Sequence, residues 1–128
     1  SIKRVWAGFS TRLSDSGLVL SFMEEEDIPF ERIVNIVKDF NIDVAGIMHT
    51  DVNAVSKSLK VLRNFYDGPL MVYPDSGGWV SPNWDFDRVI QPRQLKSFAE
   101  KWIKEGVNII GGCCGLSPNH IREIAQLK

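Results

Sequence analysis

The stretch "VNIIGGCCGLSPNHIREIAQLK", residues 107–128, joins a short apolar run to a helical pattern through a loop of glycines and two adjacent cysteines. The apolar run does not alternate with polar residues, which is typical of a strand buried on both faces. Ser117 and Pro118 suit the N-cap and the first helical position, so they predict where the helix begins. A strand that leads through a loop into a helix is the repeating unit of an α/β protein.

The same unit occurs three more times upstream. The apolar runs are "RVWAGF", which is followed by a polar stretch and "LVLSF", then "DVAGIM" and "PLMVY". In each of these units, apolar residues at helical spacing follow the apolar run. They are Phe30, Ile33, Val34, Val37 and Phe40 in the first; Val52, Val55, Leu59, Leu62 and Tyr66 in the second; and Leu95, Phe98, Ala99 and Trp102 in the third. Gly106 is expected to end the third of these helices.

Short apolar runs separated by helices indicate a parallel sheet whose faces helices cover. Four βα units therefore predict an α/β fold with four parallel strands. The pattern fits half of a TIM (β/α)8 barrel as well as a small doubly wound sheet, and by itself it does not separate them. Because the chain begins with Ser1, we expect a processed, tagged or excised piece.

The composition excludes some partners. The 128 residues are enough for one domain, and 15 Lys and Arg against 16 Asp and Glu give a net charge of −1, so nucleic acid is not an expected partner. No apolar run approaches the roughly 20 residues that cross a bilayer, so no membrane partner is expected either. Adjacent cysteines suit a structural disulfide poorly, which favours a reducing, cytoplasmic location where thiols bind metal or react.

In both architectures ligands bind where the strands end and the βα loops begin. Those ends carry "MHTD" (residues 48–51), "YPDSGG" (73–78) and "GGCCG" (111–115). We therefore expect one rim of the sheet to hold five chemically useful side chains, namely His49, Tyr73, Asp75, Cys113 and Cys114.

The rim residues suggest a metal site. Successive strand side chains point to opposite faces, so Cys113 and Cys114 can meet one ion only if the chain leaves strand geometry, which neighbouring glycines permit. With His49 they form a Cys2His set, known for zinc, whose open fourth position could take a substrate thiol and lower its pKa. The alternatives are buried structural cysteines, a phosphate held by "GG" backbone N–H groups, and a simple hydrogen-bonded histidine.

Other features have simpler interpretations. His120, in the first turn of a helix, is expected to be a surface or capping residue, and the acidic run Glu24 to Glu26 a solvated loop. The two tryptophans of "GGWVSPNWDF" belong either to the core or to a lid over the rim, and the sequence favours neither.

These residues also carry a resemblance to a family. "GVNIIGGCCGLSPNHIREIA" resembles the terminal zinc motif of the homocysteine S-methyltransferase family: Gly-Gly-Cys-Cys, a short turn, Pro, then His-Ile-Arg. "VWAGFS", "VAGIMHTD" and "PLMVYPDSGG" are similar to the family's fifth, sixth and seventh strands. The resemblance implies that residues 1–128 are a partial homocysteine-binding domain, strands five to eight of a (β/α)8 barrel.

The resemblance also implies a reaction. Family members bind zinc through three cysteines and the homocysteine sulfur, and this thiolate takes a methyl group from a sulfonium, a betaine or a folate to give methionine. By position, Cys113 and Cys114 are zinc ligands, and the third cysteine falls on His49. Tyr73 and Asp75 fall in the substrate-binding segment.

The chain departs from the family pattern. His49 stands in place of Cys, Met48 in place of Asn, and Asp75 in place of Asn. A neutral ligand makes the site less negative, which should hold a thiolate more tightly but make it a poorer nucleophile. Asp75 could bind an ammonium group or disturb the site.

The chain is also only about half as long as a barrel of this family requires. We therefore expect the isolated chain to be inactive, and to self-associate or pair with a missing N-terminal half through its open strand edges. The alternative function is a non-catalytic metal- or phosphate-binding module.

Overall fold

A computed structural model describes residues 3–127 and leaves Ser1 outside the described part. Its central sheet has the order β1-β4-β5-β8, and every neighbouring pair is parallel. The strands are β1 (Trp6–Phe9), β4 (Val44–Asp51), β5 (Leu70–Asp75) and β8 (Val107–Ile110). The predicted α/β fold with four parallel strands is thus confirmed.

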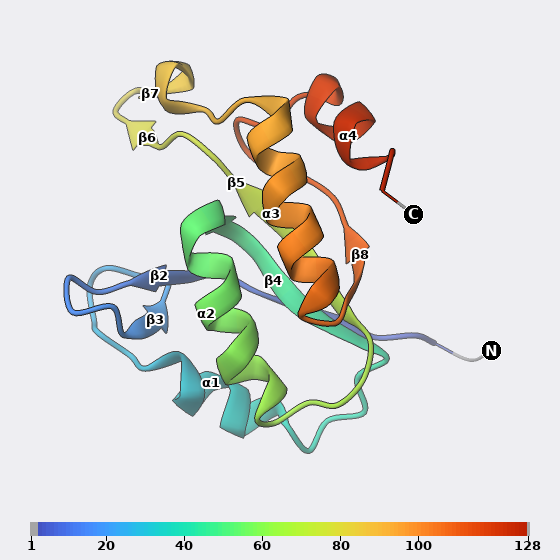
Figure 1. Cartoon of the computed structure of the whole chain (residues 1–128). Helices are drawn as coiled ribbons and strands as arrows, with labels where there is room; N and C mark the ends of the chain where they lie inside the picture. Colours follow the sequence, from blue (N-terminus) through green and yellow to red (C-terminus); the bar gives the residue numbers. More distant parts are fainter. Residues whose placement is uncertain (1–2, 128) are drawn as a thin grey trace.

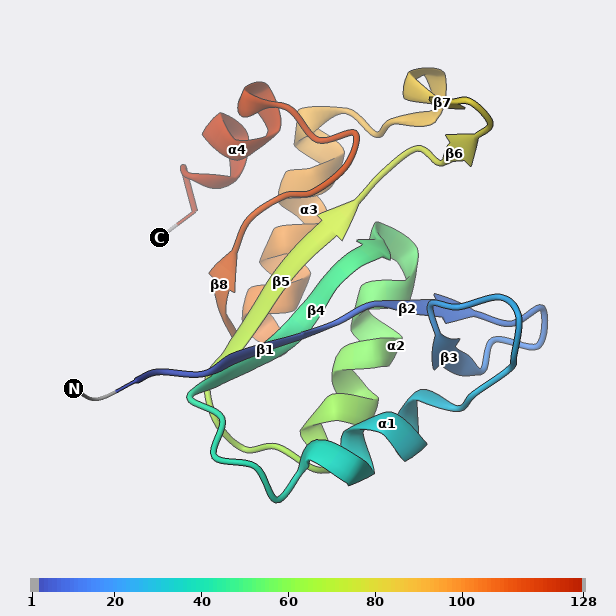
Figure 2. The same ribbon diagram turned by 180° about the vertical axis from the view of Figure 1, so that it is seen from behind.

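The helices lie on one side of this sheet. They are α1 (Phe30–Val37), α2 (Val52–Arg63), α3 (Pro92–Lys104) and α4 (Pro118–Ile124). Helices α2 and α3 lie in front of the sheet in Figure 1, and in the reverse view of Figure 2 no helix of residues 3–127 crosses in front of the four strands. A doubly wound sheet carries helices on both faces, so this arrangement argues against that alternative. The half barrel stays a prediction.

The core follows from strand alternation. In β4, Ala45 and Ile47 face the helices and are almost completely buried, whereas Met48 points to the opposite face and is exposed. The remaining core is apolar and comes from all four βα units; its most buried members include Phe30, Val55, Leu62, Val72, Leu95 and Trp102. This packing fixes the strand ends relative to one another, and it therefore positions the rim.

Two small antiparallel hairpins extend beyond the sheet. Strands β2 (Thr11–Leu13) and β3 (Val19–Ser21) form the first, and β6 (Trp79–Val80) and β7 (Asn83–Trp84) form the second, which the short 3-10 helix η1 (Phe86–Arg88) follows. The apolar run "LVLSF" therefore contributes a hairpin strand outside the parallel sheet. Gly17, with φ of 83°, supports the reversal between β2 and β3.

Most predicted helix limits are confirmed, with two corrections. Gly106 has φ of 96° and its N–H donates to the carbonyl of Ile103, and Ser117 and Pro118 begin α4. Phe40, however, is exposed, because the chain ends α1 with a tight turn in which the Phe40 N–H donates to the Val37 carbonyl. Tyr66 lies beyond α2, where its hydroxyl donates to the Asp43 carbonyl.

Candidate metal centre

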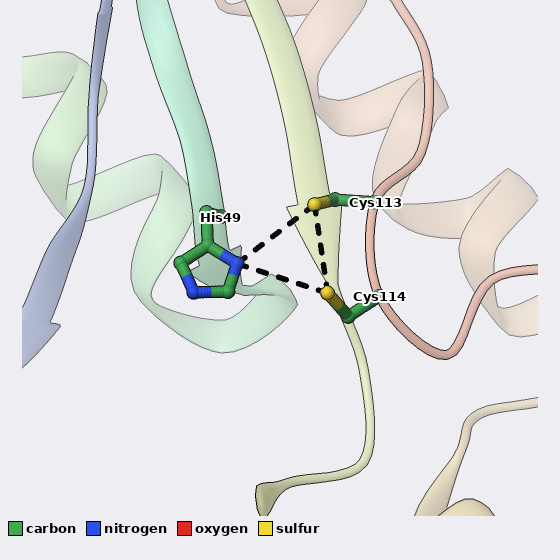
Figure 3. Close-up of side chains that lie close together, drawn as sticks. All are labelled: His49, Cys113 and Cys114. Carbon is green, nitrogen blue, oxygen red and sulfur yellow. Dashed lines mark hydrogen bonds between the residues drawn. The ribbon is translucent and has the colours of Figure 1, made fainter. Parts of the chain in front are cut away.

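The carboxyl ends of β4, β5 and β8 meet on one rim, because all three strands run in the same direction. His49 lies near the end of β4, Asp75 is the last residue of β5, and the two cysteines lie in the loop after β8. Figure 3 shows the His49 ring facing both sulfurs across the end of β5. Side chains from three separate βα units are thus brought together.

Three ligand atoms form a nearly regular triangle. His49 Nδ1 lies 3.8 Å from Cys113 Sγ and 3.9 Å from Cys114 Sγ, and the two sulfurs are 3.8 Å apart. All three side chains are half-buried, and both cysteines are free thiols. One ion could contact all three atoms at once, so this group could hold a metal ion.

The cysteine loop is positioned by main-chain hydrogen bonds to the end of β5. The Cys113 N–H donates to the Pro74 carbonyl at 2.8 Å, and the Ser76 N–H donates to the Cys114 carbonyl at 3.1 Å. Gly115 has φ of 80°, and a Cβ there would lie 2.0 Å from the Ser76 carbonyl oxygen. The glycine therefore lets the loop lie close to β5 with both sulfurs toward His49.

The turn that carries His49 is built differently. His49 has φ of 47°, the one positive φ of a non-glycine residue in the range 3–127, and the pairing of β4 with β5 is irregular between Met48 and Asp51. No pattern in the sequence predicts this left-handed turn. On its other side the Phe22 ring lies 4.8 Å from the His49 ring, measured between centroids.

Burial raises the pKa values of two acidic groups at the site. Asp75 Oδ2 lies 3.3 Å from His49 Nδ1, and burial raises the pKa of the Asp75 carboxyl despite this neighbour. Burial, followed by the hydrogen bond with Cys113, raises the pKa of the Cys114 thiol. A metal ion that binds here must therefore displace a proton.

A cavity of about 870 Å³ opens beside the triangle. His49, Asp75 and Cys114 line it, together with Phe22, Trp79 and Trp84. Trp79 is exposed and Trp84 is half-buried, so the two tryptophans form a wall of the cavity and not part of the core.

Tyr73 does not line this cavity. It is half-buried, and a Cβ on Gly111 would lie 2.2 Å from its ring, so the ring packs against the start of the cysteine loop. Its substrate-binding role stays a prediction. Phe22 was not predicted to lie at the site; its only signal in the sequence is its place at the end of the apolar run "LVLSF".

His120 is a buried capping residue and does not belong to the ligand group. Its Nδ1 accepts from the Ser117 N–H at 3.1 Å, and its Nε2–H donates to the Ile90 carbonyl at 2.7 Å. The capping prediction is confirmed, whereas a surface position is wrong, because the ring fills the space between α4 and the segment before α3. The run Glu24 to Glu26 is exposed, as expected of a solvated loop.

Within residues 3–127, none of the helices has both the length and the apolar character that crossing a bilayer requires.

Comparison with known proteins agrees with this architecture. The model of the family described as homocysteine S-methyltransferase matches residues 3–127. Homocysteine S-methyltransferase 3 of Zea mays is 29% identical over 86 residues, which cover 65% of this chain and 25% of the maize protein. Homocysteine S-methyltransferase 1 of Saccharomyces cerevisiae is 30% identical over 113 residues, 81% of this chain and 33% of the yeast protein.

A solved structure shows the same similarity. The metallated form of the homocysteine methyltransferase MmuM from Escherichia coli superposes with a TM-score of 0.62 at 25% identity, over 94% of this chain and 34% of that protein. The chain thus spans a quarter to a third of the length of these relatives. Since the family model matches nearly all of its residues, the chain belongs to the homocysteine S-methyltransferase family.

Proposed function

We propose that the chain is the zinc-holding half of a (β/α)8 barrel that transfers a methyl group to the thiol of homocysteine, or a related thiol, to give methionine. The observation that carries this proposal is the triangle formed by His49 Nδ1 and the sulfurs of Cys113 and Cys114. Family membership supports the reaction, although the chain covers only part of each relative.

The triangle has the size that a tetrahedral zinc ion requires. Zinc–sulfur bonds of about 2.3 Å and zinc–nitrogen bonds of about 2.0–2.1 Å place the ligand atoms roughly 3.6–3.8 Å apart. The three separations in this chain are 3.8, 3.8 and 3.9 Å, so zinc fits with little movement of the side chains. Thiolate and imidazole ligands also suit zinc better than magnesium or calcium.

Each residue then has a role. His49, Cys113 and Cys114 hold the ion and leave one position for the substrate sulfur. The chemistry that zinc supplies when bound is a lower pKa of the substrate thiol, so that a thiolate is present at neutral pH. Asp75, buried on the floor of the cavity, can pair with the ammonium group of an amino acid substrate, and we keep Tyr73 as a second candidate for substrate binding.

The methyl donor would enter from the open side of the same cavity. Trp79 and Trp84 form its outer wall, and they can exclude water from the reacting atoms. We further propose a cytoplasmic location, because two free neighbouring thiols persist best in a reducing compartment.

The two outer strands suggest how the barrel is completed. In the described part of the chain β1 and β8 each pair on one side only. Such edges readily pair with another strand. We therefore propose that the isolated chain self-associates or pairs with an N-terminal half, and that it is inactive by itself.

Metal and thiol titrations test the proposed function. The purified chain should bind one equivalent of zinc, and X-ray absorption should show two sulfur neighbours and one imidazole nitrogen. With Co²⁺ in place of zinc, homocysteine should intensify the sulfur-to-cobalt absorption, whereas homoserine, which has a hydroxyl in place of the thiol, should not. A chain that binds zinc but not homocysteine would fit the non-catalytic module, and a chain without zinc affinity would overturn the proposal.

A further inference from the structure

Three buried hydroxyl side chains lie directly behind the His49 turn. We name Thr11, Thr50 and Ser58 the hydroxyl cluster; they come from β2, the end of β4 and α2, and at most 2% of each residue is exposed. Thr11 and Thr50 are 39 positions apart in the sequence, so the fold alone brings them together. Buried hydroxyl groups must find hydrogen-bond partners, and here they find one another.

The hydrogen bonds of the cluster have a definite direction. Ser58 Oγ donates to the Ala54 carbonyl at 2.9 Å, so it accepts from Thr11 Oγ1 at 2.7 Å. This contact ties Thr11 to α2. The Thr11 backbone N–H then donates to Thr50 Oγ1 at 2.9 Å. The Thr11 N–H thus occupies one acceptor site of Thr50 Oγ1 and leaves the hydroxyl hydrogen of Thr50 free for another acceptor.

The Thr50 hydroxyl spans the His49 turn. Thr50 Oγ1 donates to the Met48 carbonyl at 2.9 Å, so the residue after His49 is hydrogen-bonded to the residue before it. A left-handed backbone is unfavourable for any residue with a Cβ, and it persists only where the surroundings hold it. The contacts of the His49 ring with Phe22 and Asp75 act on the side chain and do not fix its φ.

We propose that Thr50 is a positioning residue: its hydroxyl holds the left-handed turn at His49, and this turn directs Nδ1 toward Cys113 and Cys114. The effect on metal binding rests on the proposed zinc site. The effect on the backbone does not, because the hydrogen bonds are made by protein atoms alone.

Three variants of the chain separate this role from general stability. Thr50→Val keeps the side-chain shape and removes the hydroxyl, and Thr50→Ser restores the hydroxyl. Ser58→Ala is the matched control, since it removes a hydroxyl of the same cluster but leaves the two short hydrogen bonds of Thr50 and its longer contact with Thr11 Oγ1 at 3.5 Å in place. Circular dichroism and thermal unfolding give the stability of each variant.

The first measurement needs no metal. In the metal-free chain, NMR should show a nuclear Overhauser contact between the rings of Phe22 and His49, whose centroids are 4.8 Å apart. We expect Thr50→Val to lose this contact, and Thr50→Ser and Ser58→Ala to keep it. If Thr50→Val keeps the contact, or Ser58→Ala loses it equally, the positioning role is overturned.

The second measurement uses zinc affinity and the Co²⁺ spectrum. Groups that orient a metal ligand typically change metal affinity by about 10- to 100-fold when removed, and we expect a loss of that size for Thr50→Val. Thr50→Ser should restore the affinity and the spectrum, and Ser58→Ala should leave both unchanged. Unchanged affinity in a folded Thr50→Val overturns the proposal. If the unaltered chain binds no zinc, the proposed function fails, while the ring contact still decides the role of Thr50.

A third measurement covers the case in which Thr50→Val does not fold. In the unaltered chain the Thr11 amide must exchange slowly with solvent, because the Thr50 hydroxyl accepts its hydrogen. Rapid exchange of this amide would overturn the proposal without any variant.

Discussion

The cysteine loop after β8 and the His49 turn at the end of β4 present ligand atoms to the same point by different physical means. The loop uses a glycine at φ of 80° and main-chain hydrogen bonds to the end of β5. The turn uses a residue with a full side chain at φ of 47°, and buried hydroxyl groups lie behind it. The loop is therefore sensitive to added atoms, whereas the turn is sensitive to lost hydrogen bonds.

Removal of a loop ligand should have the largest effect. Cys114→Ser should lower zinc affinity by more than about 100-fold, because loss of a ligand exceeds the usual effect of an orienting group. Elemental analysis and competition with a chelator measure this. Cys113→Ser is the matched variant and should behave alike. If either variant bound one equivalent of zinc as tightly as the unaltered chain, the cysteine loop would not supply metal ligands.

Substitution of the loop glycine should come next. Gly115→Ala forces an unfavourable φ and places a Cβ against the Ser76 carbonyl, so the free energy of unfolding should fall by about 1–3 kcal/mol. Gly112→Ala is the control, since its φ is not positive and its Cβ would meet only side-chain atoms, of Leu116 at 3.2 Å and of Ile121 at 3.4 Å. Urea denaturation compares the two. Equal losses would show that backbone conformation is not what distinguishes the loop.

On the other side of the comparison, His49→Ala should weaken zinc binding less than Cys114→Ser does. Two thiolates remain as ligands, so we expect roughly a 100-fold loss, at the upper end for changes around a metal and no smaller than that of Thr50→Val, which acts through His49. The same chelator competition measures it. A loss as large as that of Cys114→Ser would mean that the turn and the loop contribute equally.

The pH dependence of zinc affinity should sharpen the comparison further. Zinc needs deprotonated thiols, so affinity should rise with pH, by up to about 10-fold per pH unit for each thiol that loses a proton. Because the pKa of Cys114 is raised, this rise should continue above the ordinary thiol range. Titrations from pH 6 to pH 9 should show a shallower slope for Cys114→Ser than for the unaltered chain. An unchanged slope would contradict a role for this thiol.

The smallest effect should come from Asp75, which lies between the two segments. Its folded-state pKa is raised by burial, so its ionised form reduces stability at neutral pH, and this cost disappears once the pH falls below its ordinary value of 3.8. Asp75→Asn should therefore stabilise the metal-free chain at pH 7 and have no such effect near pH 3.5. Denaturation at the two pH values measures this; equal shifts at both would contradict it.

The sequence predicted the loop far better than the turn. The motif Gly-Gly-Cys-Cys-Gly by itself predicts a bend in the chain that carries two thiols. The apolar runs predict that this bend follows a parallel strand. The turn is spanned by the hydrogen bond from Thr50 to Met48, and the buried surroundings of Thr50, such as the Thr11 N–H that donates to it, exist only in the folded chain. His49 could be proposed as a ligand from its place at a strand end, but its left-handed backbone could not.

The same reasoning explains the other differences. Both hairpins are short and have no apolar periodicity, so the sequence pattern did not predict strands β2 and β6. Phe40 continued the helical spacing of α1 but lies beyond its last turn, where pattern and structure commonly differ. Phe22 lies at the rim because the β2–β3 hairpin reverses the chain direction after β1, and the sequence did not predict this hairpin.

The order of the strands in the sheet, β1-β4-β5-β8, is also their order in the chain, and this has a consequence for folding. Each new βα unit can pair with the unit made just before it, so assembly can proceed from the first unit to the last. The ligand triangle links the second unit to the fourth, across 64 residues between His49 and Cys113. A bound ion would therefore close a long loop and act as a cross-link that forms last, since only a fully assembled chain offers all three atoms. Zinc uptake during refolding should then report the arrival of the final unit.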